Sequence, residues 1–113
     1  MELNERQIGT VIVVDLKIEF HQRGQYEPLQ QLVRAHLGAG QQQFMLNLAG
    51  CEWIDSAGLG ELIKLLVAVM RQGGNLKLAT VPHKVKGILA ITNLTQVFEI
   101  FETEEAALAS FAR

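Results

Sequence analysis

The chain has 113 residues, of which 49% are hydrophobic and 19% charged, and ten basic against twelve acidic side chains leave a formal charge of −2. This length and composition are typical of one globular domain, residues 1–113, and exclude global disorder. The slight acidity argues against nucleic acid as a partner, because proteins that bind it usually carry a basic patch. A single cysteine, Cys51, suits a reducing compartment. No apolar run approaches about 18 residues and the N-terminus has no signal-peptide core, so we expect a cytoplasmic protein.

Strands and helices are predicted to alternate along the chain. Alternating or β-branched runs predict strands, and apolar residues at i, i+3, i+4 and i+7 predict amphipathic helices. Residues 17–25 have little pattern and are predicted to form a loop. The predicted elements are strands at 3–8 and 11–16, a helix at 28–38, a strand at 44–48, a helix at 59–71, a strand at 76–79, a helix opened by Pro82, a strand at 97–101 and a helix after Thr103. This order, ββαβαβαβα, predicts an α/β fold in which helices pack on a mixed β-sheet.

Capping residues mark the ends of several predicted helices. The glycine pair at 73–74 ends the second helix. Asn93 lies where the third helix should end, and asparagine is the residue after glycine that best tolerates a left-handed cap. Thr103 is the expected N-cap of the last helix, whose first turn carries Glu104 and Glu105.

Enzyme motifs are not found. Residues 58–63 begin like a dinucleotide-binding fingerprint, but Ile63 occupies the position of the third glycine, and no P-loop is present. Ser56 lacks the first glycine of a nucleophile elbow. The three histidines and Cys51 are not spaced as metal ligands, and His36 and Cys51 are predicted to be packing residues. Trp53 is predicted to cover the core near a strand end. We therefore expect no catalysis, no metal and no cofactor.

The segment 53–62 stands apart, because it joins a strand to the most regular helix. Asp55 or Ser56 can cap that helix, so capping alone would explain both residues. Capping does not explain Gly58 and Gly60, since each glycine inside a helix costs about 1 kcal/mol relative to alanine. Glycine leaves bare backbone that another surface or an anion can approach closely. The residues alone leave both interpretations open, simple capping and a recognition surface.

Residues 54–60, Ile-Asp-Ser-Ala-Gly-Leu-Gly, are similar to the D-S-[STA]-G-L-G signature of STAS domains, especially those of bacterial anti-anti-sigma factors. The resemblance covers most of the chain, including the strands before and after the motif and the segment 81–94. It implies a single STAS domain that acts as an anti-sigma factor antagonist by partner switching. Its partner would be an anti-sigma factor, usually a histidine-kinase-like serine kinase, that is released when Ser56 is phosphorylated. A PP2C-type phosphatase would reset the system.

The resemblance also suggests where a partner binds. We expect contacts from the motif turn and the exposed side of the following helix, at Asp55, Ser56, Ala57, Gly58, Leu59, Gly60, Glu61 and Lys64, with Leu65 at the margin. Gly58→Leu is expected to weaken partner binding without unfolding the domain.

One segment departs from the family pattern. Many such regulators carry G-x-[LV]-D after the early strand, whereas Lys17–Phe20 here has neither glycine nor aspartate, and Glu19 is the acid available. The alternative function is therefore a STAS subunit of a stress complex or a transporter-associated assembly, which binds constitutively without a serine switch.

Overall fold

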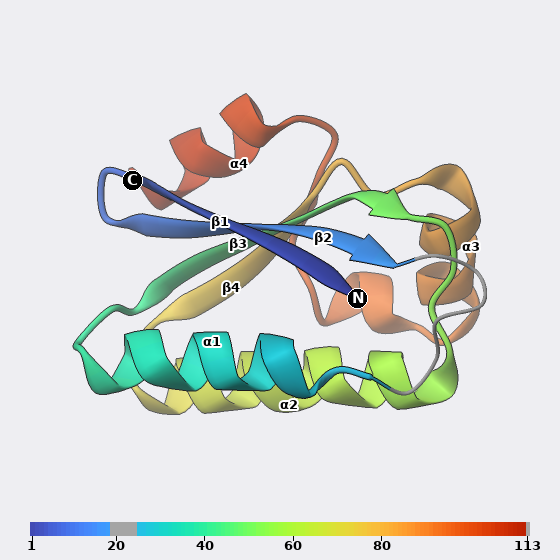
Figure 1. Cartoon of the computed structure of the whole chain (residues 1–113). Helices are drawn as coiled ribbons and strands as arrows, with labels where there is room; N and C mark the ends of the chain where they lie inside the picture. Colours follow the sequence, from blue (N-terminus) through green and yellow to red (C-terminus); the bar gives the residue numbers. More distant parts are fainter. Residues whose placement is uncertain (19–24, 113) are drawn as a thin grey trace.

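Five strands form one sheet in the order β1-β2-β3-β4-β5 (Figure 1). The computed structural model describes residues 1–18 and 25–112. The strands are β1 Glu2–Ile8, β2 Val11–Ile18, β3 Gln43–Cys51, β4 Asn75–Ala79 and β5 Ile100–Phe101. β1 is antiparallel to β2, and every other neighbouring pair is parallel. The mixed sheet and the order ββαβαβαβα are as predicted from the sequence.

Helices cover both faces of this sheet. They are α1 Glu27–Gly38, α2 Ser56–Arg71, α3 His83–Ile91 and α4 Glu104–Phe111, with a short 3-10 helix at Leu94–Gln96. α1 and α2 lie side by side on one face and run in the same direction, while α4 lies on the opposite face (Figure 1). Because both faces are covered, β2 is buried continuously from Val11 to Val14 rather than alternating.

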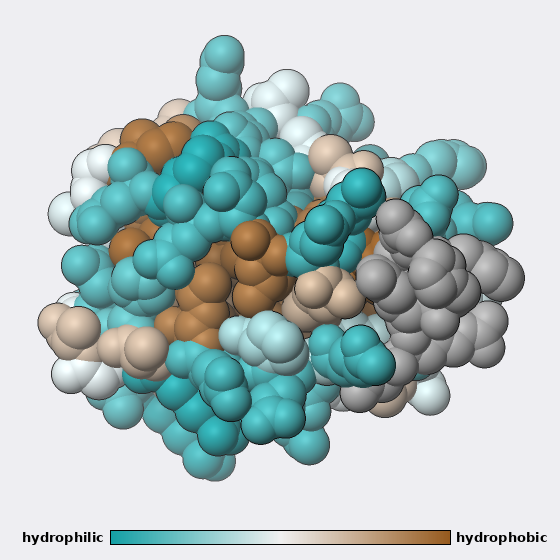
Figure 2. Space-filling model, viewed as in Figure 1, coloured by the Kyte–Doolittle hydropathy of each residue, from teal (hydrophilic) through white to brown (hydrophobic). Residues whose placement is uncertain are grey.

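The core therefore has two parts. Ile12, Val14 and the buried apolar residues of α1 and α2 belong to the larger cluster, and Val11 and Val13 join Ala107 of α4 in the smaller one. Around the edge strand β1 the larger cluster approaches the surface. Figure 2 shows apolar surface gathered in the middle of this face, between the teal side chains above and below it.

Three predicted strand boundaries are wrong by two or more residues. β3 continues to Cys51 rather than ending at Leu48. β2 continues through Lys17 and Ile18, which pair with Gly50 and Cys51 of β3. The last strand begins at Ile100 rather than at Val97. Residues 19–24, which include most of the predicted loop, lie outside the described residues.

The predicted helix ends agree with the structure. Asn93 has φ 62°, the left-handed conformation expected of it. The Thr103 side chain accepts a hydrogen bond from the backbone N–H of Ala106 at 3.1 Å and caps α4. Gly73 follows the end of α2 with φ +83°, where a left-handed residue is needed to stop the helix.

Candidate functional site

The motif turn ends β3 and starts α2, and Asp55 is its cap. Asp55 has an extended backbone (φ −92°, ψ 176°), and its Oδ1 accepts a hydrogen bond from the Gly58 N–H at 2.8 Å. This bond satisfies one of the amide groups that an α-helix leaves unpaired in its first turn. Of the two residues that the sequence allowed as cap, Asp55 has this role, and Ser56 is left as the first residue of the helix.

A second donor reaches the same oxygen. The Tyr26 hydroxyl donates to Asp55 Oδ1 at 2.8 Å, and Tyr26 itself is only 7% exposed. Burial, followed by the neighbouring Asp55 carboxylate, raises the pKa of the Tyr26 phenol well above its usual range. The phenol therefore stays protonated and remains a donor at any physiological pH. Tyr26 was not among the predicted site residues, because its only signal in the sequence is an aromatic residue directly before a predicted helix.

Packing, and not an approaching partner, explains why position 58 is glycine. A Cβ at Gly58 would lie 2.5 Å from the Tyr26 hydroxyl and 2.7 Å from Ile54 Cγ1. Gly58 and Leu59 are both buried. The interpretation of Gly58 as open backbone is therefore wrong, and Gly58→Leu would disrupt the fold. At Gly60 the interpretation agrees with the structure, because a Cβ there would meet no described atom within 4 Å apart from its chain neighbours and the nearby backbone of its own helix.

The remaining predicted contact residues form an exposed surface, here called the motif surface: Asp55, Ser56, Ala57, Gly60, Glu61 and Lys64. Ser56, Ala57 and Lys64 are exposed, and the others are half-buried. The Ser56 hydroxyl makes no hydrogen bond to any residue in the described part of the chain. Lys64 Nζ lies 3.6 Å from Glu61 Oε1, and Gln30 of α1 donates to the same carboxylate. Leu65 is only 4% exposed, so in this structure its side chain is not accessible to a partner.

Comparison with known proteins identifies this arrangement. The model of the STAS domain family matches residues 4–107. The chain belongs to the STAS domain family. A Thermotoga maritima protein provisionally named as an anti-sigma factor antagonist is 31% identical over 77 residues, which cover 68% of each chain. A Thermotoga neapolitana homologue is 35% identical over 72 residues, and the aligned part spans 64% of this chain and 64% of that protein.

Solved structures share the fold of this STAS domain. The crystal structure of a Thermotoga maritima anti-sigma factor antagonist, also provisionally named, matches with a TM-score of 0.86 and 23% identity, covering 98% of this chain and 95% of that one. SpoIIAA, a Bacillus cell fate determinant solved in its phosphorylated form, matches with a TM-score of 0.76 and 15% identity, covering 97% and 99%. At these identities the likeness concerns the fold. By homology with the Thermotoga maritima protein, the STAS domain is placed in the anti-sigma factor antagonist family.

The other residues singled out in the sequence have packing roles in this STAS domain. Cys51 is buried, and burial raises the pKa of its thiol to about 12, so it is a poor nucleophile. His36 Nε2 lies 2.9 Å from Glu5 Oε1, and its ring packs edge-on against Phe44 with centroids 6.4 Å apart. Trp53 is half-buried, and Lys84 Nζ lies 6.0 Å from its ring centroid. Within the described residues, no group of three side chains could hold a metal ion.

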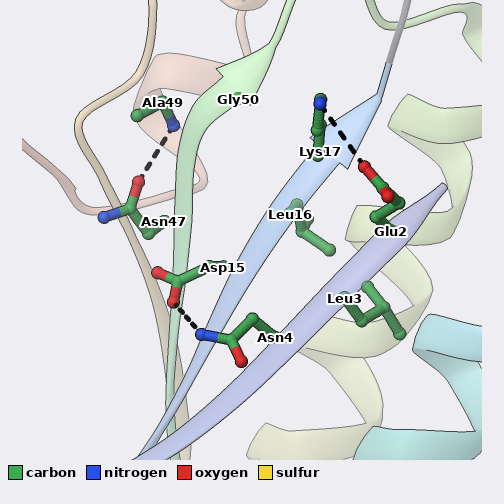
Figure 3. Close-up of a pocket in the computed structure, with 9 residues that line it drawn as sticks. All are labelled: Glu2, Leu3, Asn4, Asp15, Leu16, Lys17, Asn47, Ala49 and Gly50. Carbon is green, nitrogen blue, oxygen red and sulfur yellow. Dashed lines mark hydrogen bonds and ion pairs between the residues drawn. The ribbon is translucent and has the colours of Figure 1, made fainter.

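A pocket of about 500 Å³ lies at the ends of β1, β2 and β3 and shares none of its lining residues with the motif surface (Figure 3). Its polar side chains are bonded to their neighbours. Asn4 donates to Asp15 at 3.1 Å, Lys17 pairs with Glu2 at 3.5 Å, and Asn47 accepts from the Ala49 N–H at 2.9 Å. These bonds indicate a structural role for the pocket walls. Among the described residues, no helix is long and apolar enough to cross a membrane.

Proposed function

We propose that this STAS domain is an anti-sigma factor antagonist whose binding is switched off by phosphorylation of Ser56. The observation that carries the proposal is the position of Ser56: an exposed hydroxyl on the first residue of α2, directly after the Asp55 cap. The homology with anti-sigma factor antagonists and the phosphorylated form of the related SpoIIAA support it. The domain then acts by binding, and not as an enzyme.

Phosphorylation at this position should leave the fold intact. The phosphate would lie at the positive end of α2, where backbone N–H groups favour an anion. Ser56 is exposed, so no core packing opposes the added volume. The effect would fall on the partner, because the phosphate adds about −1.5 to −2 charges beside Asp55.

This charge is large enough to release a moderately tight complex. At an effective dielectric constant of about 20, one like-charge contact at about 6 Å costs roughly 3 kcal/mol. Since 1.4 kcal/mol is about a tenfold change in affinity, the penalty is on the order of a hundredfold. Steric exclusion adds to it. The proposed partner is a histidine-kinase-like anti-sigma factor that phosphorylates Ser56, and a PP2C-type phosphatase would restore binding in the cytoplasm.

The test combines two variants with phosphate mapping. Ser56→Ala should bind the anti-sigma factor and resist release by ATP, whereas Ser56→Asp should bind on the order of a hundredfold more weakly while melting like the parent. Incubation with the kinase and ATP, followed by mass spectrometry, should locate the phosphate on Ser56. Phosphate on another residue, or tight binding by Ser56→Asp, would instead favour a constitutively bound subunit of a larger assembly.

A further inference from the structure

A groove between the C-terminal halves of α1 and α2 carries two arginines that pair with no side chain in the described part of the chain. The groove has a volume of about 580 Å³ and is lined by Arg34, Leu37, Gly38, Ala68, Arg71 and Gln72. Arg34 and Arg71 are exposed, and neither forms a hydrogen bond or an ion pair with any residue of the described ranges. This differs from the pocket in Figure 3, whose charged walls are bonded to one another. We call this surface the arginine groove.

Helix α2 contributes residues to both the arginine groove and the motif surface. Arg71 is fifteen residues after Ser56 on α2, which is about 22 Å along a helix. Lys64, Val67 and Met70 are exposed between the two ends, with Val67 40% and Met70 58% exposed. The outer side of α2 is therefore a continuous strip in which cationic and apolar side chains alternate.

The motif surface is too small to hold a protein partner by itself. A stable interface buries about 800 Å² on each partner and involves roughly 20 to 30 residues. Ser56, Ala57 and Gly60 are small, and they offer little area of their own. An interface centred on Ser56 must extend over neighbouring exposed residues, and the outer side of α2 leads directly to the arginine groove.

The charges along this route define what the partner must present. Arg34, Lys64 and Arg71 are cationic, while the carboxylate of Glu61 is half-buried and already accepts from Gln30. The groove is also lined by the half-buried apolar residues Leu37 and Ala68. A segment with carboxylates flanking an apolar side chain matches both features. Two or three cations in a chain of charge −2 are few for a nucleic acid, whose binding relies on many phosphate contacts.

We propose that the arginine groove is a second docking site for the anti-sigma factor, which inserts an acidic segment with an apolar side chain between α1 and α2. This inference rests on the proposed function and adds a region of the interface that phosphorylation of Ser56 does not touch. The groove contributes to affinity whether or not Ser56 is phosphorylated, and phosphorylation of Ser56 controls release of the anti-sigma factor.

Charge-reversal variants test the inference in the complete chain. Arg34→Glu and Arg71→Glu should each weaken binding of the anti-sigma factor by about tenfold, and the loss should shrink at about 0.5 M salt. Lys86→Glu is the matched control, because it makes the same charge change on α3, outside the groove. Arg71→Gln removes the cation without placing an acid at the helix end and should lose less. Equal losses in Lys86→Glu, or full affinity in both arginine variants, would overturn the inference.

A peptide probe tests the groove without the anti-sigma factor. A short peptide of alternating Glu and Leu should shift backbone NMR signals near residues 34–38 and 68–72, and the same peptide with Gln in place of Glu should not. A duplex DNA or phosphatidylglycerol vesicles that bind through Arg34 and Arg71 while the peptide does not would overturn the inference. If the arginine variants keep full affinity and Ser56→Asp still releases the anti-sigma factor, the inference fails and the proposed function stands. If Ser56→Asp has no effect, the proposed function fails, whatever the peptide does.

Discussion

A single carboxylate oxygen organises the start of α2. Asp55 Oδ1 accepts from the Gly58 N–H and from the Tyr26 hydroxyl, both at 2.8 Å. A hydrogen bond to a charged group is typically worth about 1.5 to 3 kcal/mol, more than one between neutral groups. Tyr26 lies just before α1, so this oxygen joins the beginnings of two helices. Asp55, the residue before Ser56, is therefore held in position by two hydrogen bonds.

Tyr26→Phe removes the second donor and keeps the ring. We expect the free energy of unfolding to fall by about 1 to 2 kcal/mol, measured by urea denaturation, because a charged acceptor loses a buried partner. The Gly58 amide should also exchange faster with solvent. Thr103→Ala is the control, since it removes the cap of α4 and should leave exchange at Gly58 unchanged. Unaltered stability in Tyr26→Phe would mean that water replaces the hydroxyl.

The two glycines of the motif should respond oppositely to alanine. Gly60→Ala adds a methyl group that meets no described atom within 4 Å outside its own stretch of helix, so the gain in helix propensity should stabilise the domain by about 0.5 to 1 kcal/mol. Gly58→Ala gains the same propensity but crowds Tyr26 and Ile54, which typically costs about 1 to 3 kcal/mol. Thermal unfolding of both variants should therefore place Gly58→Ala below Gly60→Ala. The reverse order would mean that the Tyr26 ring moves aside freely.

The segment between α3 and β5 depends on one left-handed residue. Asn93, at φ 62°, leads from the end of α3 into the 3-10 helix Leu94–Gln96. Asn93→Gly should be neutral or mildly stabilising, because glycine adopts positive φ without strain. Asn93→Val should cost on the order of 1 kcal/mol or more, since a β-branched residue resists this region. Denaturant unfolding measures both, and equal stability of the two variants would contradict the cap.

This turn also explains why the last strand was predicted too long. Apolar residues at 97, 98, 100 and 101 resemble a strand, and local sequence holds no sign that the chain turns first. In the structure Phe98 is buried, whereas Val97 is 50% exposed, and only Ile100 and Phe101 pair with β4. The position of the segment is set by tertiary packing, which a single sequence does not specify.

Helix α2 was located correctly, but its buried side was not fully predicted. Leu65, which was expected at the margin of the exposed side, is buried, whereas Met70 of the same helix is 58% exposed. Apolar residues occur on more of this helix than one core-facing stripe requires, so periodicity alone cannot select which of them turn inward. The motif residues were found because they are contiguous in sequence. Tyr26 was not, because its contact with Asp55 joins residues 29 positions apart.

At the scale of the whole molecule, a polar network joins both ends of the chain. Arg6 of β1 donates to Asp15 of β2 through Nη2 at 2.7 Å and Nε at 2.8 Å, and it also pairs with Glu104 at the start of α4. Asn47 of β3 donates to Glu104 at 2.7 Å. No periodicity or motif predicts contacts between residues 98 positions apart. The network therefore became visible only in the folded structure, where it fastens α4 over the sheet.

Arg6→Gln should make the stability of this STAS domain less sensitive to acid. The Arg6 guanidinium lowers the pKa of Asp15 and of Glu104, so the ion pairs stabilise the fold above the carboxylates' unfolded pKa values of about 4. This stabilisation is lost as the pH falls through the lowered folded values. Parent and variant should therefore differ most at about pH 7 and converge at about pH 2, as measured by urea midpoints. The gap should also narrow with salt, because the pair is about one third exposed.

Lys17→Gln is the control for this experiment. It breaks an ion pair with Glu2 on the same strand pair, at 3.5 Å and with both side chains more than half exposed. Exposed pairs of this kind contribute about 0 to 1 kcal/mol, so Lys17→Gln should follow the parent across the whole pH range. A gap between parent and Arg6→Gln that stays constant from about pH 7 to about pH 2 would locate the effect of Arg6 in packing of its side chain against the sheet. In that case the ion pairs of Arg6 with Asp15 and Glu104 would not account for the attachment of α4 to β1.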